Sequence, residues 1–92
     1  MRETIFVDSL KNVDFSEMKF PIVVLYDHPA DFPGDYIARV YDIRNGKVIP
    51  TNVAIRHKDL RELKEDVFCS GFQTFIPRSE EDARCIIGSC WR

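Results

Sequence analysis

The pattern of apolar positions centres on residues 20–26, which are apolar at both alternating sets of positions. Such a pattern predicts a strand that is buried on both faces. A loop with three aspartates, one histidine and two prolines follows at residues 27–35, and β-type residues resume at 36–43. We expect the rest of the chain to be arranged around this strand–loop–strand unit.

The strongest turn signal in the chain is Asn45-Gly46 between β-type flanks. It predicts a two-residue hairpin of type I′, because both central residues must adopt positive φ. A loop of this length would pair Ile43 with Val48. Pro50 has no N–H to donate, so we expect the returning strand to be short, bulged or at an edge.

One helix is expected over residues 59–68, where apolar side chains recur at i, i+3, i+7 and i+8 and form one stripe. These side chains are Leu60, Leu63, Val67 and Phe68. Asp59 is suited to cap the first turn, with Glu62 in the position of a capping box. Gly71 follows the last turn and is suited to end the helix.

The remaining elements are expected to be short. The pattern predicts an edge strand at residues 4–7, one or two helical turns within 12–19, strands at 52–55, 72–76 and 84–91, and an acidic turn at 78–83. Together these elements predict one α+β domain over residues 1–92. It would have a mostly antiparallel sheet of about five strands and one main helix packed on one face.

Composition is that of a globular chain, with 45% hydrophobic and 12% aromatic residues among 92. The net charge is −2, from 13 basic and 15 acidic side chains. Nucleic-acid binders usually carry a basic excess, because phosphate neutralisation supplies most of their affinity. We therefore expect no nucleic-acid partner.

One basic cluster stands against that expectation. Arginine and lysine side chains gather around the start of the predicted helix, at Arg56, Lys58, Arg61 and Lys64. Acidic residues interleave with them, so a solvated helix face is the preferred interpretation. The alternative is a phosphate-binding patch in a nucleic-acid-associated regulator.

The chain has no signal-peptide pattern and no apolar segment of the roughly 20 residues that span a membrane. Its three cysteines are not spaced as a disulfide framework or a paired-ligand zinc site. We expect a cytoplasmic protein whose cysteines are reduced, buried and inert.

The loop at residues 27–35 and the residue after it hold the candidate binding residues. An aromatic anchor among charges is typical of protein–protein contacts, and two prolines lower the entropic cost of docking. The candidate partner-binding residues are Asp27, His28, Asp31, Phe32, Asp35 and Tyr36. Two other interpretations stay open: Phe32 packs into the core beneath a rigid lid, or His28 and the aspartates hold a divalent cation.

The sequence contains none of the local motifs of catalysis. It has no nucleophile elbow, glycine-rich phosphate loop or paired-histidine zinc motif. We therefore predict no catalytic residue, no metal and no cofactor, and we expect the protein not to be an enzyme.

Residues 26–29 (Tyr-Asp-His-Pro), 31–33 (Asp-Phe-Pro) and 38–41 (Ala-Arg-Val-Tyr) carry a resemblance. With the downstream helix, residues 76–78 and the final strand, this region resembles small proteins of bacteria, their phages and other mobile elements. No activity is established for those proteins, so the resemblance implies no catalytic or binding residue. It implies a genomic setting, that of an accessory protein of a mobile element.

The leading hypothesis is a non-enzymatic, protein-binding accessory protein that inhibits a host defence or regulatory protein. The alternatives are a small metal- or ligand-dependent enzyme that uses the loop at 27–35, and the nucleic-acid-associated regulator. A homodimer is a further expectation, because a sheet edge at residues 4–7 or 53–55 could pair with its twin.

Overall fold

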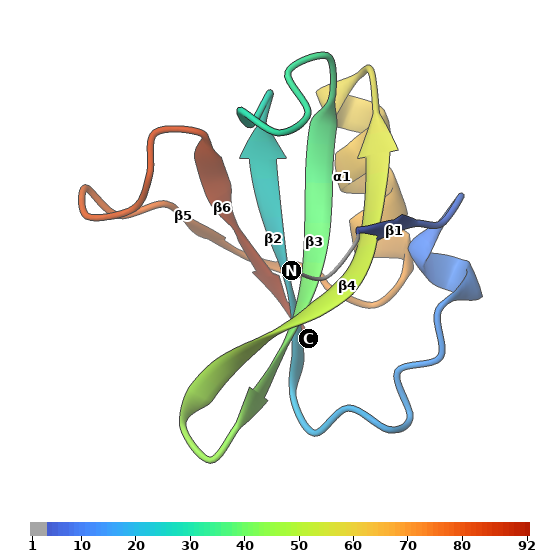
Figure 1. The fold of residues 1–92 in the computed structure, drawn as a ribbon. Helices are drawn as coiled ribbons and strands as arrows, with labels where there is room; N and C mark the ends of the chain where they lie inside the picture. The colour runs from blue at the N-terminus through green and yellow to red at the C-terminus, as the bar shows by residue number, and fades with distance from the viewer. Residues whose placement is uncertain (1–3) are drawn as a thin grey trace.

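The computed structural model describes residues 4–92 and contains one six-stranded sheet with one α-helix (Figure 1). The elements are β1 (Ile5–Phe6), the 3₁₀ turn η1 (Leu10–Asn12), β2 (Pro21–Asp27), β3 (Tyr36–Arg44), β4 (Lys47–His57), α1 (Leu60–Cys69), β5 (Thr74–Pro77) and β6 (Ile86–Trp91). The strand order is β1-β4-β3-β2-β6-β5, and every neighbouring pair is antiparallel except β1 with β4. The predicted α+β class is confirmed, with six strands instead of about five.

The sheet has one layer packed on it. Helix α1 and the segment that contains η1 lie against one face, which we call the helix side (Figure 1). The buried core lies between them and consists of Leu10, Val23, Leu25, Ala38, Val40, Ile55, Leu63, Val67, Phe72 and Cys90. On the opposite face of the sheet, which we call the open face, no helix packs in the described part of the chain, residues 4–92.

The alternation along β2 distributes its apolar residues between these two faces. Val23 and Leu25 point to the helix side and are fully buried. Val24 and Tyr26 point to the open face and are only half-buried. On the open face, the prediction that both faces of this strand are buried holds for Ile22, which is 4% exposed, and is wrong for Val24 and Tyr26, over which no second layer packs within residues 4–92.

The hairpin between β3 and β4 forms as the sequence predicts. Asn45 and Gly46 have φ values of 52° and 75°, and Ile43 lies opposite Val48. Positive φ at both central residues is the requirement of a type I′ turn. The strands of this hairpin extend past the rest of the sheet and curl away from it (Figure 1).

Pro50 does not end β4, which is 11 residues long in total and continues past the proline. Pro50 lies opposite Tyr41, and the register then shifts before Arg39, so the strand is bulged, one of the expected outcomes. The Thr51 hydroxyl donates to the Val40 carbonyl at 2.6 Å inside this irregularity. The side chain thereby satisfies a backbone acceptor within the disrupted stretch of ladder.

Helix α1 begins and ends where its sequence predicts. The Asp59 carboxylate accepts from the Arg61 N–H at 2.8 Å, which is an N-cap. At the other end Phe72 N–H donates to the Val67 carbonyl and Gly71 N–H to the Phe68 carbonyl. With Gly71 at φ 101°, these two bonds make a Schellman motif.

The N-terminal segment differs from its prediction. Residues 12–19 form no helix, but residues 15–18 make one hydrogen-bonded turn, in which Met18 N–H donates to the Phe15 carbonyl at 3.0 Å. The 3₁₀ turn of this region lies earlier, as η1 at Leu10–Asn12. The Asp66 carboxylate fixes this turn, because its Oδ1 accepts from Ser9 Oγ at 3.1 Å and from Leu10 N–H at 3.0 Å. Helix α1 thus holds the segment through a contact between residues far apart in sequence.

The expected edge strand at residues 4–7 is confirmed as the two-residue β1. Because β1 pairs with β4 at Val53 and Ala54, residues 53–55 are interior to the sheet. A dimer through residues 53–55 is therefore excluded by their position. The acidic stretch 79–83 forms a turn, in which the Asp82 carboxylate accepts from the Ser79 N–H at 3.0 Å.

Candidate functional site

The loop between β2 and β3 contains three pairs of basic and acidic side chains, of which two, Asp31–Arg39 and Asp35–Lys58, connect it to other elements. His28 Nδ1 lies 2.5 Å from Asp27 Oδ1, and His28 itself has a left-handed backbone with φ 44°. Asp31 accepts from Arg39 at 2.6 Å. Asp35 lies 2.8 Å from Lys58 Nζ, and the hydrogen bond from Lys58 lowers the pKa of the Asp35 carboxyl.

The aromatic residues of the loop also pack within the domain. The Phe32 ring meets Phe6 of β1 edge to face at 4.8 Å between centroids. The Arg39 guanidinium lies 5.7 Å from the Phe32 centroid, and the Arg56 guanidinium lies 4.6 Å from that of Phe6. The loop therefore rests on the open face at its β1 end, so Phe32 serves first as a contact within the chain.

The six predicted loop residues are thus brought together at one end of the sheet. The His28 ring lies 4.6 Å from that of Tyr36, and 44% of the His28 side chain is exposed. An imidazole bonded to a carboxylate is the arrangement in which histidine acts as a general base. The aspartates retain outward surface, but each has an intramolecular partner that any docking protein would have to complement.

The four residues of the predicted basic patch are not gathered into one surface. Arg56 lies over Phe6 beside β1, whereas Lys64 lies 5.5 Å from the ring of Phe75 in β5. These strands are the two opposite edges of the sheet. Lys58 is bound to Asp35, and Arg61 is exposed on α1.

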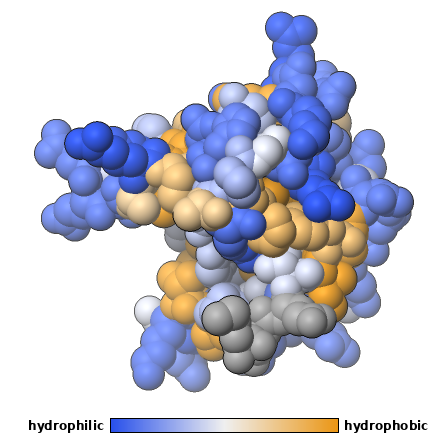
Figure 2. Space-filling view, turned by 45° about the horizontal axis from the view of Figure 1, so that its top comes forward, coloured by the Kyte–Doolittle hydropathy of each residue, from blue (hydrophilic) through white to orange (hydrophobic). Residues whose placement is uncertain are grey.

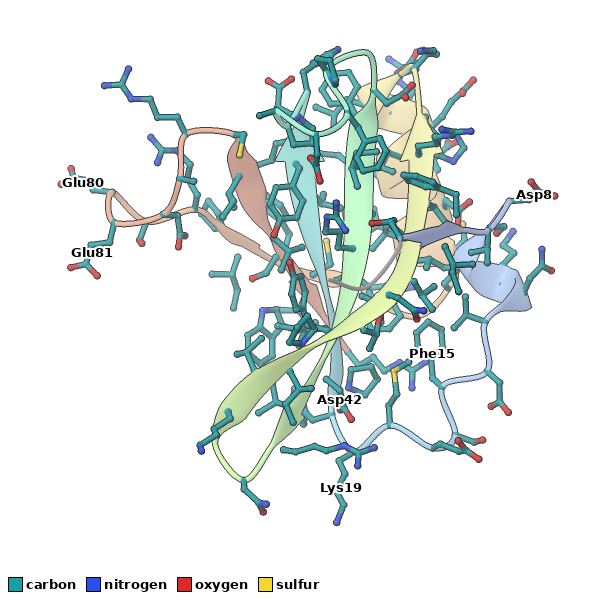
Figure 3. All side chains as sticks on the ribbon, viewed as in Figure 1. Asp8, Phe15, Lys19, Asp42, Glu80 and Glu81 are labelled. Carbon is teal, nitrogen blue, oxygen red and sulfur yellow. The ribbon has the colours of Figure 1, made fainter. Side chains whose placement is uncertain are left out.

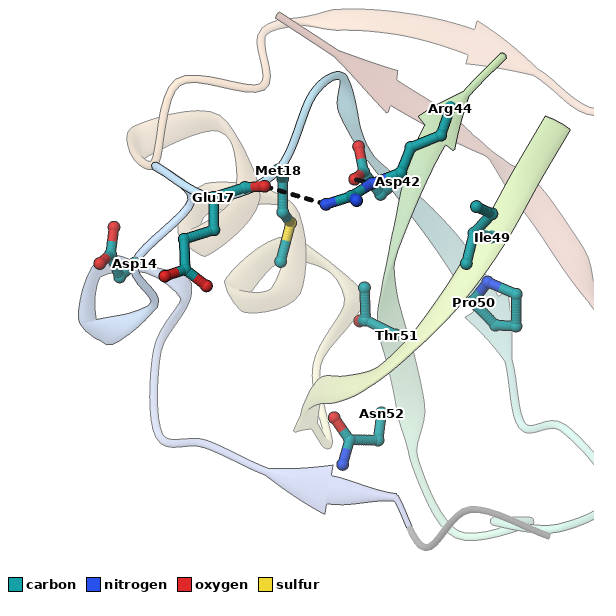
Figure 4. Close-up of a pocket in the computed structure, with 9 residues that line it drawn as sticks. All are labelled: Asp14, Glu17, Met18, Asp42, Arg44, Ile49, Pro50, Thr51 and Asn52. Carbon is teal, nitrogen blue, oxygen red and sulfur yellow. Dashed lines mark hydrogen bonds and ion pairs between the residues drawn. The ribbon is translucent and has the colours of Figure 1, made fainter. Parts of the chain in front are cut away.

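A buried carboxylate lies beneath the β3–β4 hairpin on the helix side (Figure 4). Asp42 accepts from Phe20 N–H at 2.7 Å, from Lys19 N–H at 3.2 Å and from Arg44 Nε at 2.7 Å. Arg44 also donates to the Glu17 carbonyl at 3.0 Å. The hydrogen bond from Arg44 lowers the pKa of Asp42.

This carboxylate borders a cavity of about 350 Å³, which is lined by Asp14, Glu17, Met18, Asp42, Arg44, Ile49, Pro50, Thr51 and Asn52. By accepting these hydrogen bonds, the carboxylate oxygens of Asp42 hold Lys19 and Phe20, which lead into β2, against the hairpin. A structural role accounts for every contact of Asp42 described here, so the cavity is a secondary candidate.

The sequence did not identify the apolar groove on the open face. It has a volume of about 340 Å³ and runs between β2, β6, β5 and the curled hairpin. Its apolar lining comprises Ile22, Val24, Tyr26, Val48, Ile76 and Ile86. Figure 2 shows apolar side chains gathered between charged projections on one face of the molecule.

Several large apolar side chains at or near this groove are exposed. Val48 is 57% exposed and Ile76 47%, and the exposed Phe20 ring stacks edge to face with Trp91 at 5.5 Å. The sequence did contain a signal for this groove, which was the second alternating set of apolar positions in β2. From the pattern of the strand we predicted that a second layer would bury these positions.

Charged or hydroxyl-bearing side chains also line the groove, at Tyr26, Arg78, Ser79, Asp82 and Ser89. The hydroxyls of Tyr26 and Tyr41 lie 2.7 Å apart, and burial, with this hydrogen bond, raises the pKa of Tyr26. At the other end the Arg78 guanidinium donates to the carbonyls of Ser79 and Asp82. Glu80 and Glu81 project away from the sheet at the tip of the β5–β6 loop (Figure 3). The groove is therefore suited to an apolar ligand surface with a charged rim.

His57 is the second histidine and lies under α1. Its Nε2 is buried without a hydrogen bond, 3.5 Å from Asp66 Oδ2, and its Nδ1 is 3.7 Å from Glu62 Oε2. Ser9 bonds the other oxygen of Asp66 instead of the imidazole. This arrangement lacks the hydroxyl–imidazole contact that activates a serine nucleophile.

The cysteines are all free. Cys90 is buried in the core, and burial raises its pKa to about 11. Cys69 is exposed at the end of α1, so the expectation of buried thiols is wrong for this residue. Among residues 4–92, the histidine, cysteine and acidic side chains form no group of three that could hold a metal ion.

No family model, curated protein or solved structure matches the chain. Within residues 4–92, no helix combines the length and apolarity needed to span a bilayer.

Proposed function

We propose that this domain is a non-enzymatic protein-binding module that docks its partner on the open face of the sheet. The observation that carries this proposal is the apolar groove beside β5, with Val48 and Ile76 exposed at its sides. Exposed apolar patches rimmed by polar groups mark interaction sites in soluble proteins. The complementary partner is a protein that inserts an apolar side chain between β2, β6 and the hairpin.

The loop at residues 27–35 is the weaker surface for this role. Its charges are engaged by Arg39 and Lys58, and its central ring by Phe6. A partner there would have to replace contacts that already exist within the chain. The groove needs no such exchange, because the apolar side chains at its rim have water as their neighbour.

Within this class we propose an inhibitor of a bacterial defence or regulatory protein. The support is the resemblance of residues 26–41 to small proteins of phages and other mobile elements, together with the small size of the chain. We further propose that it acts in the cytoplasm.

Two adjacent residues of the hairpin allow a matched test. Val48 lines the groove, whereas Ile49, 39% exposed, points to the helix side. Tagged protein would be cross-linked and purified from a bacterial host as wild type, Val48→Asp and Ile49→Asp. We expect a stoichiometric protein partner with wild type and Ile49→Asp that is lost with Val48→Asp. No stoichiometric partner, or retention by Val48→Asp, would overturn the proposal.

A second candidate is a ligand- or metal-dependent activity at the loop, favoured by the Asp27–His28 pair. Elemental analysis of the purified protein would be combined with a screen for bound small molecules, for wild type and His28→Ala. A metal or ligand that is present only with His28 would favour this candidate. Its absence from both proteins would remove it.

A further inference from the structure

The outer edge of β5 is a weakly protected sheet edge. The strand is last in the order, and all four of its residues are exposed, including Phe75 at 37% and Ile76 at 47%. Sheet edges are usually protected by charges, bulges or proline, because their free N–H and C=O groups recruit other strands. Strand β5 has no charged residue of its own, and its protective features are Pro77 at its end and Lys64 of α1, whose Nζ lies 5.5 Å from the centroid of the Phe75 ring.

The hydrogen-bond register shows which backbone groups face outward. Arg78 N–H donates to the Ile87 carbonyl at 3.2 Å, in the same register that pairs Ile76 with Ser89. Because alternate residues of an antiparallel strand bond to the same neighbour, Ile76 also bonds to β6. Phe75 therefore directs its N–H and C=O away from β6, and Pro77 directs only a C=O outward.

We propose that two copies of this chain pair antiparallel through β5, about a two-fold axis at Phe75. The proposal does not depend on the function proposed above. At the axis the Phe75 N–H of each copy donates to the Phe75 carbonyl of the other. Two residues away, Gln73 N–H lies opposite the Pro77 carbonyl of the second copy.

This pattern of donors and acceptors is self-complementary. Pro77 supplies the acceptor that Gln73 requires, and the donor that Pro77 lacks would fall at the exposed end of the ladder, where water can replace it. A pairing of β5 with β1 would instead be heterologous and would build a ring or an open filament, not a closed dimer. In addition, β1 offers only two residues.

The side chains around the axis also favour pairing. In this register Ile76 would lie beside Thr74 of the second copy on the open face, and the two apolar grooves would meet across the axis. On the helix side the two Phe75 residues would lie opposite each other, each with its ring over Gly88 of its own β6 and near Lys64. The exposed apolar surface of Phe75 and Ile76 would thereby be reduced in both copies. Burial of apolar surface is the main driving force of such an association.

The oligomeric state tests the proposal directly. Sedimentation equilibrium would be measured on wild type, Phe75→Lys, Ile76→Lys and Ile5→Lys. Ile5 is 51% exposed on β1, the opposite edge, and is the matched control. We expect wild type and Ile5→Lys to reach twice the 10.7 kDa mass of the chain, and both β5 variants to stay at that mass.

Cysteine cross-linking tests the register. Opposed residues of a bonded antiparallel pair have Cα atoms about 5.5 Å apart, within the reach of a disulfide. Cys69 and Cys90 are first replaced by serine and alanine, because Cys69 is exposed and Cys90 lies directly opposite position 75 in β6. In this background, Phe75→Cys should form a disulfide-linked dimer under mild oxidation, and Ile5→Cys should not. If circular dichroism shows that a lysine variant does not fold, the cross-linking experiment still tests the proposal.

Three results would overturn the proposal. The first is a wild type that stays monomeric at every concentration, and the second is a dimer that persists in both folded β5 lysine variants. The third is cross-linking at position 5 without cross-linking at position 75. A monomer that still loses its partner on Val48→Asp would refute this inference alone and leave the protein-binding function standing.

Discussion

The close contact at Gly88 gives the sharpest prediction about the stability of this fold. Gly88 lies in β6 opposite Pro77 of β5. A Cβ atom added to it would lie 2.5 Å from the Ile76 carbonyl oxygen and 2.7 Å from Cζ of the Phe75 ring. The ring occupies the space that a side chain would need, so β5 can approach β6 only at a glycine.

The substitution Gly88→Ala has two opposing effects. It reduces the conformational entropy of the unfolded chain, which stabilises a protein by about 0.4–1 kcal/mol at a compatible site. It also forces a backbone oxygen and a ring to move, and overpacking of this kind costs about 1–3 kcal/mol. Because the nearest atom belongs to the backbone, the second effect should prevail.

Gly34 provides the matched control. A Cβ atom there would lie 3.4 Å from Lys58 Nζ, the end of a flexible side chain, and the backbone is not left-handed. Gly34→Ala therefore keeps the entropic gain without the clash. We expect Gly88→Ala to be less stable than Gly34→Ala by roughly 2 kcal/mol or more.

Thermal and urea unfolding would measure this difference. For a domain of this size each kcal/mol corresponds to roughly 4–8 °C in Tm, so Gly88→Ala should unfold some 10 °C or more below Gly34→Ala. Adding Phe75→Ala to Gly88→Ala should restore only part of the loss, since the Ile76 oxygen remains in place. Equal midpoints for the two alanine variants would refute the reasoning.

The remaining predictions concern titration, thiol reactivity and the hairpin. The pKa of Asp42 is lowered in the folded state, so its stabilisation is present above the ordinary aspartate pKa of about 3.9 and is lost as pH falls through the folded value. The wild type should therefore exceed Asp42→Asn in urea stability at neutral pH, and the two should converge in acid; a gap that is constant with pH would contradict this. Cys69 should react with a thiol reagent in the native protein while Cys90 reacts only on unfolding; equal labelling rates would contradict it. Gly46→Ala should lower the free energy of unfolding by about 1 kcal/mol, since φ is 75° but no atom lies within 4 Å of the new Cβ; an unchanged unfolding midpoint would contradict it.

Elements that depend on neighbours in the chain were predictable. Asn45-Gly46 determines its own turn through the φ values it accepts, and Asp59 and Gly71 delimit α1 through bonds to residues within five positions. Such contacts carry their information in a short window of sequence. The sequence did not locate η1, because this turn is held by Asp66, more than 50 residues away.

The candidate site shows the same difference between local features, which the sequence predicts, and long-range contacts, which it does not. The sequence identified the loop at residues 27–35 as charged and aromatic, but not that Arg39 and Phe6 would engage Asp31 and Phe32. The exposed groove was hidden for a related reason. The apolar pattern of Val24 and Tyr26 does not indicate whether a second layer covers this face of the sheet.

By itself the sequence determined the α+β class, the central apolar strand, the hairpin and the single helix, because periodicity and local backbone chemistry specify these. Only the tertiary structure decided that β6 lies between β2 and β5, that one face of the sheet stays open, and that β5 ends the sheet with apolar side chains exposed. Strand order and the number of packed layers follow from the free energy of the whole assembly. Pairings between distant segments contribute to that energy, and no short stretch of residues records them.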